Sequence, residues 1–323
     1  MANPLPRDIR PAFPQAIPAE QARAKLLEVL GLDRLPEAVD FTTDAESDDG
    51  VNREIRVSYS NSLGETLTAT ILAPIHPVTD RMPGVVCMHG TGGSVENVLA
   101  TELGPDPSSG QLRGWGRELS SRDYATISIS LKGSVVRRGT EKDWEEEARL
   151  LEAYGRPHAG IVVAEALLAA RVLAAFPGVD ADRIGLTGMS LGGMATWYAM
   201  ACDPWIRAGV AICGVLGSLE RLIHEGNIRR HSSLAFVPHL LRYFDHGDIV
   251  ASCVAPRPFM AVAPADDVDM PRAAVDDFIR IVTPAYSDRH GHFVVRQPPG
   301  DHYFTVEYFE WMVAWFDRFL RGV

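Results

Sequence analysis

Residues 183–193 read RIGLTGMSLGG, and residues 194–201 continue as MATWYAMA. The first stretch is an apolar, strand-like run that leads into Gly-x-Ser-x-Gly, and the second is typical of a helix. A serine on a strained turn between a strand and a helix is pushed out above the edge of a sheet. Glycines suit both sides of the turn, because a side chain there would collide with the neighbouring strand or helix. The segment therefore predicts Ser190 as a nucleophile, flanked by Gly188 and Gly192.

The sequence around this turn predicts an α/β fold. From residue 83 onward, short apolar runs alternate with helix-like stretches, which we expect near 111–122 and 143–176. The runs are PGVVCMHG, YATISISL, RIGLTGMS, AGVAICGV, RPFMAVAPA and HFVVRQPP. Runs of this length are typical of parallel strands that are covered on both faces. A doubly wound, mostly parallel sheet follows from this alternation.

The N-terminal part of the chain predicts a different organisation. We expect residues 1–50 to form an arm with one short helix over 19–31, followed by an acidic loop through Asp49. The main domain then spans residues 51–323. Its first segment, VNREIRVSYSNSLGETLTATILAP, predicts an antiparallel hairpin at one edge of the sheet, with its turn at Asn61 to Gly64.

Residues 216–250 interrupt the alternation and are longer than a simple crossover requires. We interpret them as a helical insertion, placed before the strand RPFMAVAPA and above the carboxyl edge of the sheet, where pockets of open α/β sheets form. Its aromatic residues and histidines either line such a pocket, or the aromatic residues pack the insertion onto the sheet while the histidines are exposed. A zinc site from His231, His239 and His246 is not expected, because spacings of eight and seven residues separate successive imidazoles by roughly 11 Å along a helix.

Composition excludes several classes of protein. The 323 residues are 46% hydrophobic and carry a formal net charge of −11, which disfavours nucleic acid and anionic membranes as partners. No apolar run approaches the ~18 residues of a transmembrane helix, and the Pro-rich N-terminus is unlike a secretory signal. We therefore expect a cytoplasmic protein. The widely spaced cysteines predict buried apolar side chains rather than disulfides or a zinc site; they are Cys87, Cys202, Cys213 and Cys253.

A glycine-rich loop follows the strand PGVVCMHG and reads His89-Gly90-Thr91-Gly92-Gly93. Such a loop can turn backbone N–H groups toward a nucleophile, where an acyl-transfer intermediate needs two donors for its oxyanion. We predict the amides of Thr91 and Leu191 as these donors. The loop lacks the Lys-Ser/Thr ending of a P-loop and the full GxGxxG spacing, so nucleotide binding is not expected. His89 is interpreted as a structural residue of the loop.

The order of these motifs resembles the α/β-hydrolase superfamily. The HG-x-GG loop at 89–93 and the G-x-S-x-GG turn at 188–193 most resemble the dienelactone hydrolase and acetyl xylan esterase-like branch, as does the stretch HSSLAFVPHLLRYFDHGDIVASCVAPRPFM. The resemblance covers roughly residues 52–320. Two features depart from it. Dienelactone hydrolases proper have a cysteine nucleophile, and many relatives carry D-x-R-G where this chain has Ser130-Leu131-Lys132-Gly133.

In the α/β-hydrolase fold the catalytic residues follow one another along the chain as serine, acid and histidine. This order selects the remaining catalytic candidates. The strand RPFMAVAPA ends in three carboxylates, Asp266, Asp267 and Asp269. Relatives commonly place the acid four residues before a proline, which here is Pro271 and indicates Asp267, with Asp266 as the alternative. His302 lies after the last strand and before the final helix, which is the expected place for the base.

Together these residues predict a Ser-His-Asp triad that hydrolyses esters of small molecules through an acyl-enzyme, with no metal or organic cofactor. Acylated sugars are one such substrate class. Peptide, amide or lactone cleavage on the same triad is the alternative within enzymes. A non-catalytic binding protein on the same fold is the alternative outside them.

Overall fold

The computed structural model describes residues 17–32, 34–35, 37–132, 137, 144–225, 230–231 and 233–322. Its main feature is a nine-stranded sheet with the order β1-β2-β3-β7-β4-β8-β9-β10-β11. The strands of this sheet are β1 (Thr42–Asp48), β2 (Asn52–Ser60), β3 (Thr66–Pro74), β4 (Met82–Met88), β7 (Ala125–Ile129), β8 (Val179–Met189), β9 (Ala208–Ile212), β10 (Phe259–Val262) and β11 (Phe293–Arg296).

The six strands from β7 to β11 in the sheet order are parallel, whereas β1, β2 and β3 are antiparallel to one another and β3 is antiparallel to β7. This confirms the predicted doubly wound, mostly parallel sheet with an antiparallel hairpin at its edge. The hairpin pairs Ser60 with Thr66 next to its turn, as the Asn61 to Gly64 signal predicts. Parallel strands need crossover helices, and these cover both faces of the sheet.

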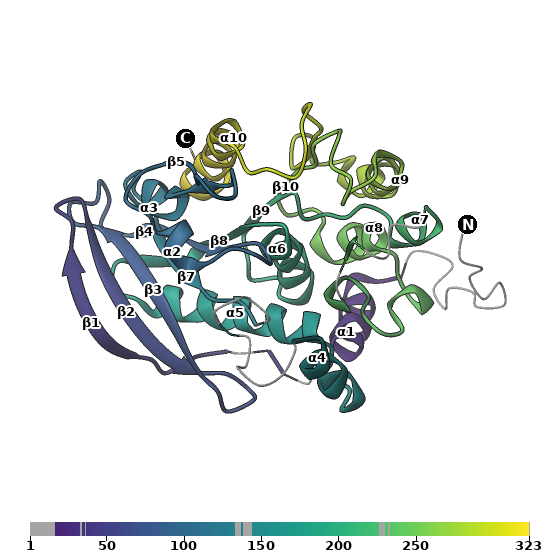
Figure 1. Ribbon diagram of the computed structural model, residues 1–323, viewed down its shortest axis with the longest axis horizontal. Helices are drawn as coiled ribbons and strands as arrows, with labels where there is room; N and C mark the ends of the chain where they lie inside the picture. Colours follow the sequence, from purple (N-terminus) through teal and green to yellow (C-terminus); the bar gives the residue numbers. More distant parts are fainter. Residues whose placement is uncertain are drawn as a thin grey trace.

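The helices are α1 (Ala19–Val29), α2 (Val95–Val98), α3 (Trp115–Ser120), α4 (Trp144–Ala153), α5 (His158–Ala175), α6 (Leu191–Cys202), α7 (Leu219–His224), α8 (His246–Ile249), α9 (Arg272–Val282) and α10 (Val306–Phe316). Helices α5 and α6 pack on one face of the sheet against β4, β8 and β9, and α3 and α10 pack on the other face against β7, β9 and β10 (Figure 1). A short second sheet pairs β5 (Gly104–Pro105) with β6 (Leu112–Arg113).

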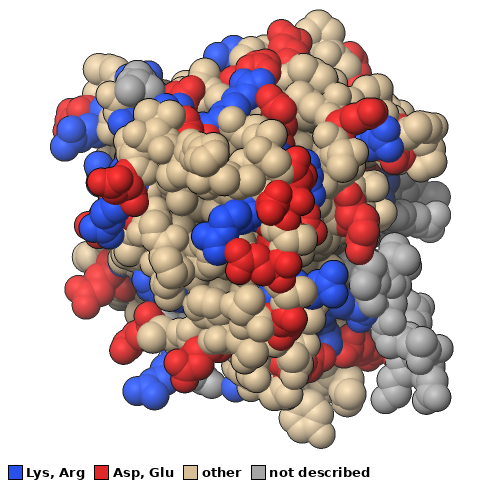
Figure 2. All heavy atoms as spheres, turned by 90° about the vertical axis from the view of Figure 1, so that its left-hand side faces the viewer, with Lys and Arg blue, Asp and Glu red and all other residues tan. Residues whose placement is uncertain are grey.

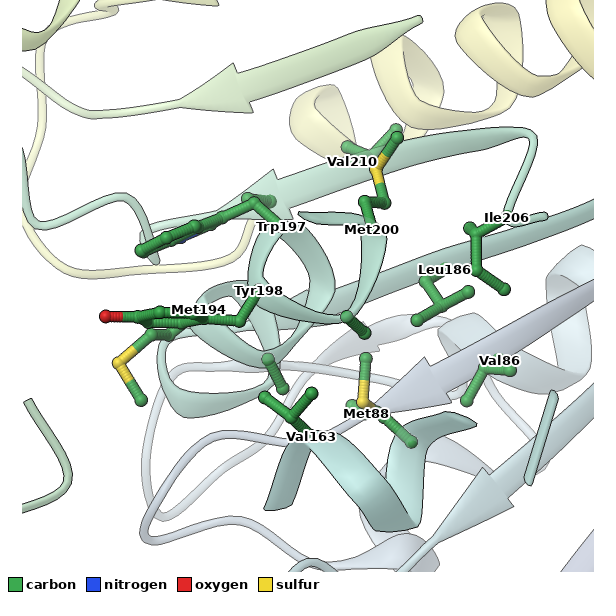
Figure 3. Close-up of a cluster of buried hydrophobic side chains, with 14 of the residues drawn as sticks. Val86, Met88, Val163, Leu186, Met194, Trp197, Tyr198, Met200, Ile206 and Val210 are labelled. Carbon is green, nitrogen blue, oxygen red and sulfur yellow. The ribbon is translucent and has the colours of Figure 1, made fainter. Parts of the chain in front are cut away.

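The core lies where α5 and α6 meet the central strands. Figure 3 shows Val86 of β4 and Leu186 of β8 facing the side chains of α6, with Ile206 beside them. Trp197 of α6 stacks on Tyr198, with ring centroids 3.9 Å apart, and its indole N–H donates a hydrogen bond to the carbonyl of Gly214 at 3.0 Å. This bond satisfies the one polar atom of a fully buried indole.

Strand β1 was not predicted, because its sequence TTDAESD is polar throughout and was expected to be a loop. All of its residues are exposed, so no apolar alternation marks it as a strand. Polar cross-strand contacts hold it on β2 instead: Arg53 pairs with Glu46 at 2.7 Å and the Ser58 hydroxyl donates to Asp44 at 2.9 Å. Figure 2 looks onto this side of the molecule, where acidic and basic side chains are interspersed. Charged residues on an edge strand also discourage pairing with other chains.

Two predicted helices are shorter than expected. The helix expected over 143–176 is divided into α4 and α5, because Gly155 has φ +70° and Pro157 lacks the amide N–H that a continuous helix would use. The helix expected near 111–122 begins only at Trp115, because residues 112–113 pair with β5. The helix predicted over 19–31 is confirmed as α1, whereas the Pro-rich residues 1–16 lie outside the described part of the chain.

The insertion at 216–250 is not continuously helical. Between β9 and β10 the described residues form α7, two single 3₁₀ turns at Ser233–Ala235 and Leu240–Arg242, and α8, which runs into a π-helical turn at Val250–Val254. His231, His239 and His246 therefore do not share one helix. The separation of roughly 11 Å expected for successive imidazoles along one helix therefore does not describe these three histidines.

One helix among the described residues, α5, is long and apolar enough to cross a membrane, which the sequence analysis missed. In this fold 72% of it is buried, and it contacts β4, β7 and β8, so its apolar surface faces the sheet. The predicted cytoplasmic location and the predicted division at residue 50 stay predictions. All four cysteines are buried free thiols.

The packing of the central sheet predicts a matched pair of stability effects. Leu186→Ala removes a fully buried side chain, and Leu150→Ala removes one from α4 that is 50% exposed. We expect the first change to lower the free energy of unfolding by about 2–5 kcal/mol, because it leaves a cavity. The second should cost less than about 0.5 kcal/mol. Urea unfolding followed by circular dichroism measures both, and equal losses would contradict the assigned core.

Candidate active site

Ser190 occupies a strained turn between β8 and α6. Its backbone has φ +52° and ψ −111°, a conformation that a residue with a side chain rarely adopts. The turn is fixed from both sides: the Ser190 N–H donates to the carbonyl of Ile212 at 2.8 Å, and the Met194 N–H donates to the carbonyl of Ser190 at 2.8 Å. Ser190 thus lies between the carboxyl end of β8 and the start of α6, as the sequence predicts.

The two glycines that flank this turn pack against each other. A Cβ on Gly188 would lie 2.5 Å from the carbonyl carbon of Gly192, and a Cβ on Gly192 would lie 2.4 Å from the carbonyl oxygen of Met88. No side chain fits at such distances. Glycine at these positions therefore allows α6 to start directly against β8 and β4.

The glycine-rich loop at 89–93 lies beside Ser190. A Cβ on Gly90 would approach the Ser190 Cβ to 3.3 Å, so the loop is in close contact with Ser190. Thr91 and Leu191 both line the pocket that contains Ser190. The Leu191 amide is the first of α6 and has no acceptor within the helix, so it is available to an oxyanion.

His89 has a structural environment. The amide of Leu131 donates to its Nε2 at 3.3 Å, so Nδ1 carries the proton and donates to the carbonyl of Gly90 at 2.7 Å. Burial lowers the pKa of His89, which keeps the ring neutral. His89 connects the glycine-rich loop to Leu131 in the loop after β7, in agreement with the structural role expected for it.

His302 and Asp267 form a hydrogen-bonded pair next to this pocket. The distance from His302 Nδ1 to Asp267 Oδ2 is 2.7 Å, and the Asp267 side chain is fully buried whereas that of His302 is 23% exposed. The second oxygen of Asp267 accepts the backbone N–H of Asp269 at 2.8 Å. A carboxylate held in this way fixes the orientation and tautomer of the imidazole, leaving Nε2 free to face the pocket.

The neighbouring aspartates have different partners. Asp266 accepts the backbone N–H of Gly300 at 2.9 Å and donates its own N–H to the carbonyl of Gly300 at 3.0 Å, so it braces the loop rather than the imidazole. Asp269 lies farther from the ring, with its Oδ2 3.8 Å from His302 Nδ1. The geometry therefore favours Asp267 over Asp266 as the partner of His302.

The acidic surroundings set the protonation of His302. Burial lowers the pKa of the imidazole, but the hydrogen bond and charge of Asp267, together with the charges of Asp269 and Asp301, more than offset this effect. The pKa of His302 is therefore raised from its ordinary value. An imidazolium formed during a reaction is stabilised by the same carboxylates.

A pocket of about 520 Å³ joins Ser190 and His302. One part of its wall is apolar and comes from the sheet, α6 and the insertion; it includes Met189, Met194, Leu216, Leu234 and Ala235. Another part carries hydroxyl and amide groups from the segment between β4 and α3; it includes Ser94, Asn97, Ser108, Ser109 and Gln111. The volume fits a small-molecule ligand.

Two residues of the insertion that the sequence analysis did not assign to the site also line this pocket. The guanidinium of Arg230 pairs with Asp269, and His231 lies beside it, where burial lowers the pKa of its imidazole. The sequence context of Arg230, a polar stretch between short helices, gave no signal of this placement, whereas lining a pocket was one of two roles left open for His231. Part of the insertion therefore does cover the carboxyl edge of the sheet, as expected.

The loop that departs from the D-x-R-G pattern points elsewhere. The Lys132 ammonium pairs with Glu65 at 2.6 Å and with Glu147 at 2.8 Å, and its side chain is buried in an ion network outside the pocket. Arg137 joins the same network through Glu165 and Glu65. Gly133 lies outside the described residues. Lys132 thus connects the turn between β2 and β3, α4 and the loop after β7, and it does not line the pocket.

One group among the described residues has the spacing of a metal site, namely Cys213, Asp267 and His302, whose donor atoms lie within 4.8 Å of one another. Two of these residues, His302 and Asp267, already form a hydrogen bond of 2.7 Å with each other. Burial also raises the pKa of the Cys213 thiol well above its ordinary value, and a neutral thiol is a poor ligand. The group fits an acid–base pair with a thiol behind it better than a metal centre.

Comparisons with known proteins agree with this geometry. No known protein-family model matches the chain. The chain is 29% identical over 227 residues to the protein named "Putative hydrolase YtaP" of Bacillus subtilis (strain 168). The matched region covers 69% of this chain and 74% of that protein. Among solved structures, a "putative acetyl xylan esterase" of Bacteroides fragilis superposes with a TM-score of 0.69 at 18% identity, covering 90% of this chain and 79% of that one. A glucuronoyl esterase from Solibacter usitatus gives a TM-score of 0.67 at 13% identity, with 98% of both chains covered.

The chain has the α/β-hydrolase fold. In this fold the nucleophile, the oxyanion loop, the acid and the base arise from the carboxyl ends of neighbouring strands. The structure brings the predicted residues of the present chain together in that way. Ser190, Thr91, Leu191 and His302 line one pocket, and Asp267 lies directly behind His302.

The two neighbouring aspartates of the α/β-hydrolase site give a matched test of the acid. Asp267→Asn removes the charge that raises the pKa of His302 and replaces the carboxylate acceptor with a weaker, neutral amide oxygen, so we expect that pKa to fall. Asp266→Asn keeps an oxygen for Gly300 and should leave the pKa of His302 nearly unchanged. NMR titration of the imidazole measures both variants. A larger fall in Asp266→Asn would assign the acid to Asp266.

Proposed function

We propose that this chain is a carboxylic ester hydrolase that works through Ser190, His302 and Asp267. The observation that supports the proposal is one pocket lined by Ser190 in its strained turn, by His302 bonded to Asp267, and by Thr91 and Leu191. The solved structures of the same fold named above are described as esterases, which supports this chemistry. The residues present need no metal for it.

The mechanism follows from the chemistry of these groups. Nε2 of His302 takes the proton of the Ser190 hydroxyl as Oγ forms a bond to the ester carbonyl carbon. The amides of Thr91 and Leu191 stabilise the resulting oxyanion. The C–O bond to the alcohol then breaks, and the alcohol leaves with the proton from His302. Water repeats the sequence on the acyl-enzyme and releases the carboxylic acid.

Asp267 acts without transferring a proton. It accepts the hydrogen bond of Nδ1, which fixes Nε2 as the basic nitrogen, and its charge stabilises the imidazolium. Complete burial strengthens this interaction, because little water competes for the carboxylate.

The walls of the pocket favour an ester with unlike halves. Apolar residues near Met194 and Leu234 suit a short acyl chain, whereas the hydroxyl and amide groups of Ser108, Ser109 and Asn97 suit an alcohol that carries hydroxyl groups. We therefore propose small esters of polyhydroxylated alcohols, such as acylated sugars, as substrates. Faster hydrolysis of simple aryl esters than of acylated sugars would contradict this part of the proposal.

Loss of the nucleophile tests the proposed reaction. Ser190→Ala should reduce the hydrolysis of p-nitrophenyl acetate by at least about 10³-fold and abolish labelling by a fluorophosphonate, because both need Oγ to form a covalent bond. Turnover of p-nitrophenyl esters of increasing chain length, with Leu150→Ala as the control, gives the measurement. Equal labelling of wild type and Ser190→Ala would refute the proposal. Turnover of amides or lactones in preference to esters would redirect it.

The pH dependence follows from the raised pKa of His302. Only the neutral imidazole accepts the serine proton, so kcat/KM should be lost as the pH falls through this pKa, which lies above the ordinary value of about 6.5. Asp269→Asn removes one of the charges that raise it and should move the acid limb to lower pH. An unmoved or upward-shifted limb in Asp269→Asn would show that this carboxylate does not act on the base.

A further inference from the structure

The small hairpin of β5 and β6 contacts the loop that carries His302, although nearly 200 residues separate them in sequence. The amide nitrogen of Gln111 donates to the carbonyl of His302 at 2.7 Å, and the amide oxygen of the same side chain accepts the N–H of Phe304 at 2.9 Å. Next to it, the Leu112 N–H donates to the carbonyl of Phe304 at 3.1 Å. The side chain of Gln111 thus bonds the backbone on both sides of Tyr303.

We infer that Gln111 is a positioning residue that holds the backbone of the His302 loop in the geometry required for proton transfer. The inference rests on the proposed function of the same site. Neither the fold nor the sequence pattern indicated a role for the hairpin. The inference gives it the role of holding the backbone of His302, while Asp267 holds the imidazole.

The loop has few other restraints at this point. The His302 N–H and the Tyr303 N–H both bond to Asp301, which belongs to the loop itself. The Cys213 thiol makes a weak contact with the carbonyl of Tyr303 at 3.6 Å. Among the described residues, the strong hydrogen bonds that reach the backbone of residues 302–304 from elsewhere in the fold come from Gln111 and Leu112. Without the Gln111 side chain, one bond of this kind remains.

The chemistry of the contact requires glutamine. One end of the side chain must donate and the other must accept, at a reach that asparagine lacks by one methylene. Glutamate would keep the acceptor for Phe304 but would direct a carboxylate oxygen at the carbonyl of His302. Methionine has a similar length and makes neither bond.

The hairpin itself is built to be rigid. Asp106 accepts hydrogen bonds from the hydroxyls and N–H groups of Ser108 and Ser109, which lower its pKa to about 2, and its own N–H donates to the carbonyl of Gln111 at 2.7 Å. On the loop side, the ring of buried Phe304 packs on Trp115 with centroids 5.4 Å apart. Gln111 therefore connects two ordered elements, which is what a positioning contact needs.

The functional consequence follows from the two bonds that the imidazole must make. Its Nδ1 lies 2.7 Å from Asp267, and its Nε2 must reach the hydroxyl of Ser190. A shift of about 1 Å in a catalytic group costs up to about 100-fold in rate. A looser His302 backbone would also populate the Asp267 hydrogen bond less, which removes part of what raises the pKa of the imidazole.

The test compares Gln111→Met and Gln111→Glu with wild type. We expect both variants to lower kcat for p-nitrophenyl acetate by about 10- to 100-fold. KM should stay within about threefold, because the other residues of the pocket wall are retained while proton transfer is impaired. In Gln111→Met the pKa of His302, measured by NMR titration, should also fall. Glu102→Gln breaks the exposed ion pair with Arg113 at the base of the same hairpin and should change neither quantity.

A folded Gln111→Met with kcat and the pKa of His302 both unchanged would overturn the inference. If that variant does not fold, Gln111→Glu, which keeps the bond to Phe304, decides by the same criteria. Failure of both to fold would show a role in stability instead and would likewise overturn it. The NMR titration does not depend on turnover, so it still tests the positioning role of Gln111 if wild type hydrolyses no ester. Absence of ester hydrolysis in wild type would count against the proposed function alone.

Discussion

The close contact between Gly188 and Gly192 is the constraint on which the site depends. It lets α6 begin directly at the end of β8, so Ser190 takes a conformation that is unfavourable by itself and is imposed by the packing around it. The same contact brings α6 against Met88, at the end of the neighbouring strand, so the loop at 89–93 emerges beside the serine. A side chain at either glycine would separate these elements.

The parallel register turns this local contact into a site. Met88 pairs with Gly188, Met189 pairs with Ile212, and Ile212 pairs with Val262, so four strands end in one row. The loops that follow carry Thr91, Ser190, Cys213 and Asp267. Residues distant in sequence meet because parallel strands share a carboxyl edge. His302 is the exception: its loop comes from β11 at the edge of the sheet and must reach back over β10.

The sequence predicted those parts of the site that local backbone geometry determines. The turn at Ser190 and the loop at Thr91 have glycine patterns that the backbone requires, and His302 follows from its place between the last strand and the last helix. The choice between Asp266 and Asp267 depends on which carboxylate faces the imidazole, and adjacent residues differ in this only through tertiary contacts.

Other elements had no local signal. Strand β1 lacks apolar alternation because both of its faces are exposed, and pairing with β2 alone makes it a strand. Residues 230–231 reach the pocket through a chain of short helices whose path depends on packing. The bonds between Gln111 and the His302 loop join segments with no shared pattern. Long-range polar contacts of this kind leave no periodicity in the sequence.

The loop that carries His302 explains why such contacts matter here. His302 is attached at the sheet edge and depends on side-chain bonds for its position, whereas Ser190 is fixed by backbone packing at the sheet centre. Asp267 restrains the imidazole, and Gln111 restrains the backbone. Asp269 adds charge near the ring, and Arg230 from the insertion neutralises part of it. Asp267 therefore acts on both the orientation and the protonation of His302, whereas Asp269 acts through its charge and Gln111 through the backbone. Substitutions at these positions can change His302 while the strand–turn–helix around Ser190 stays the same.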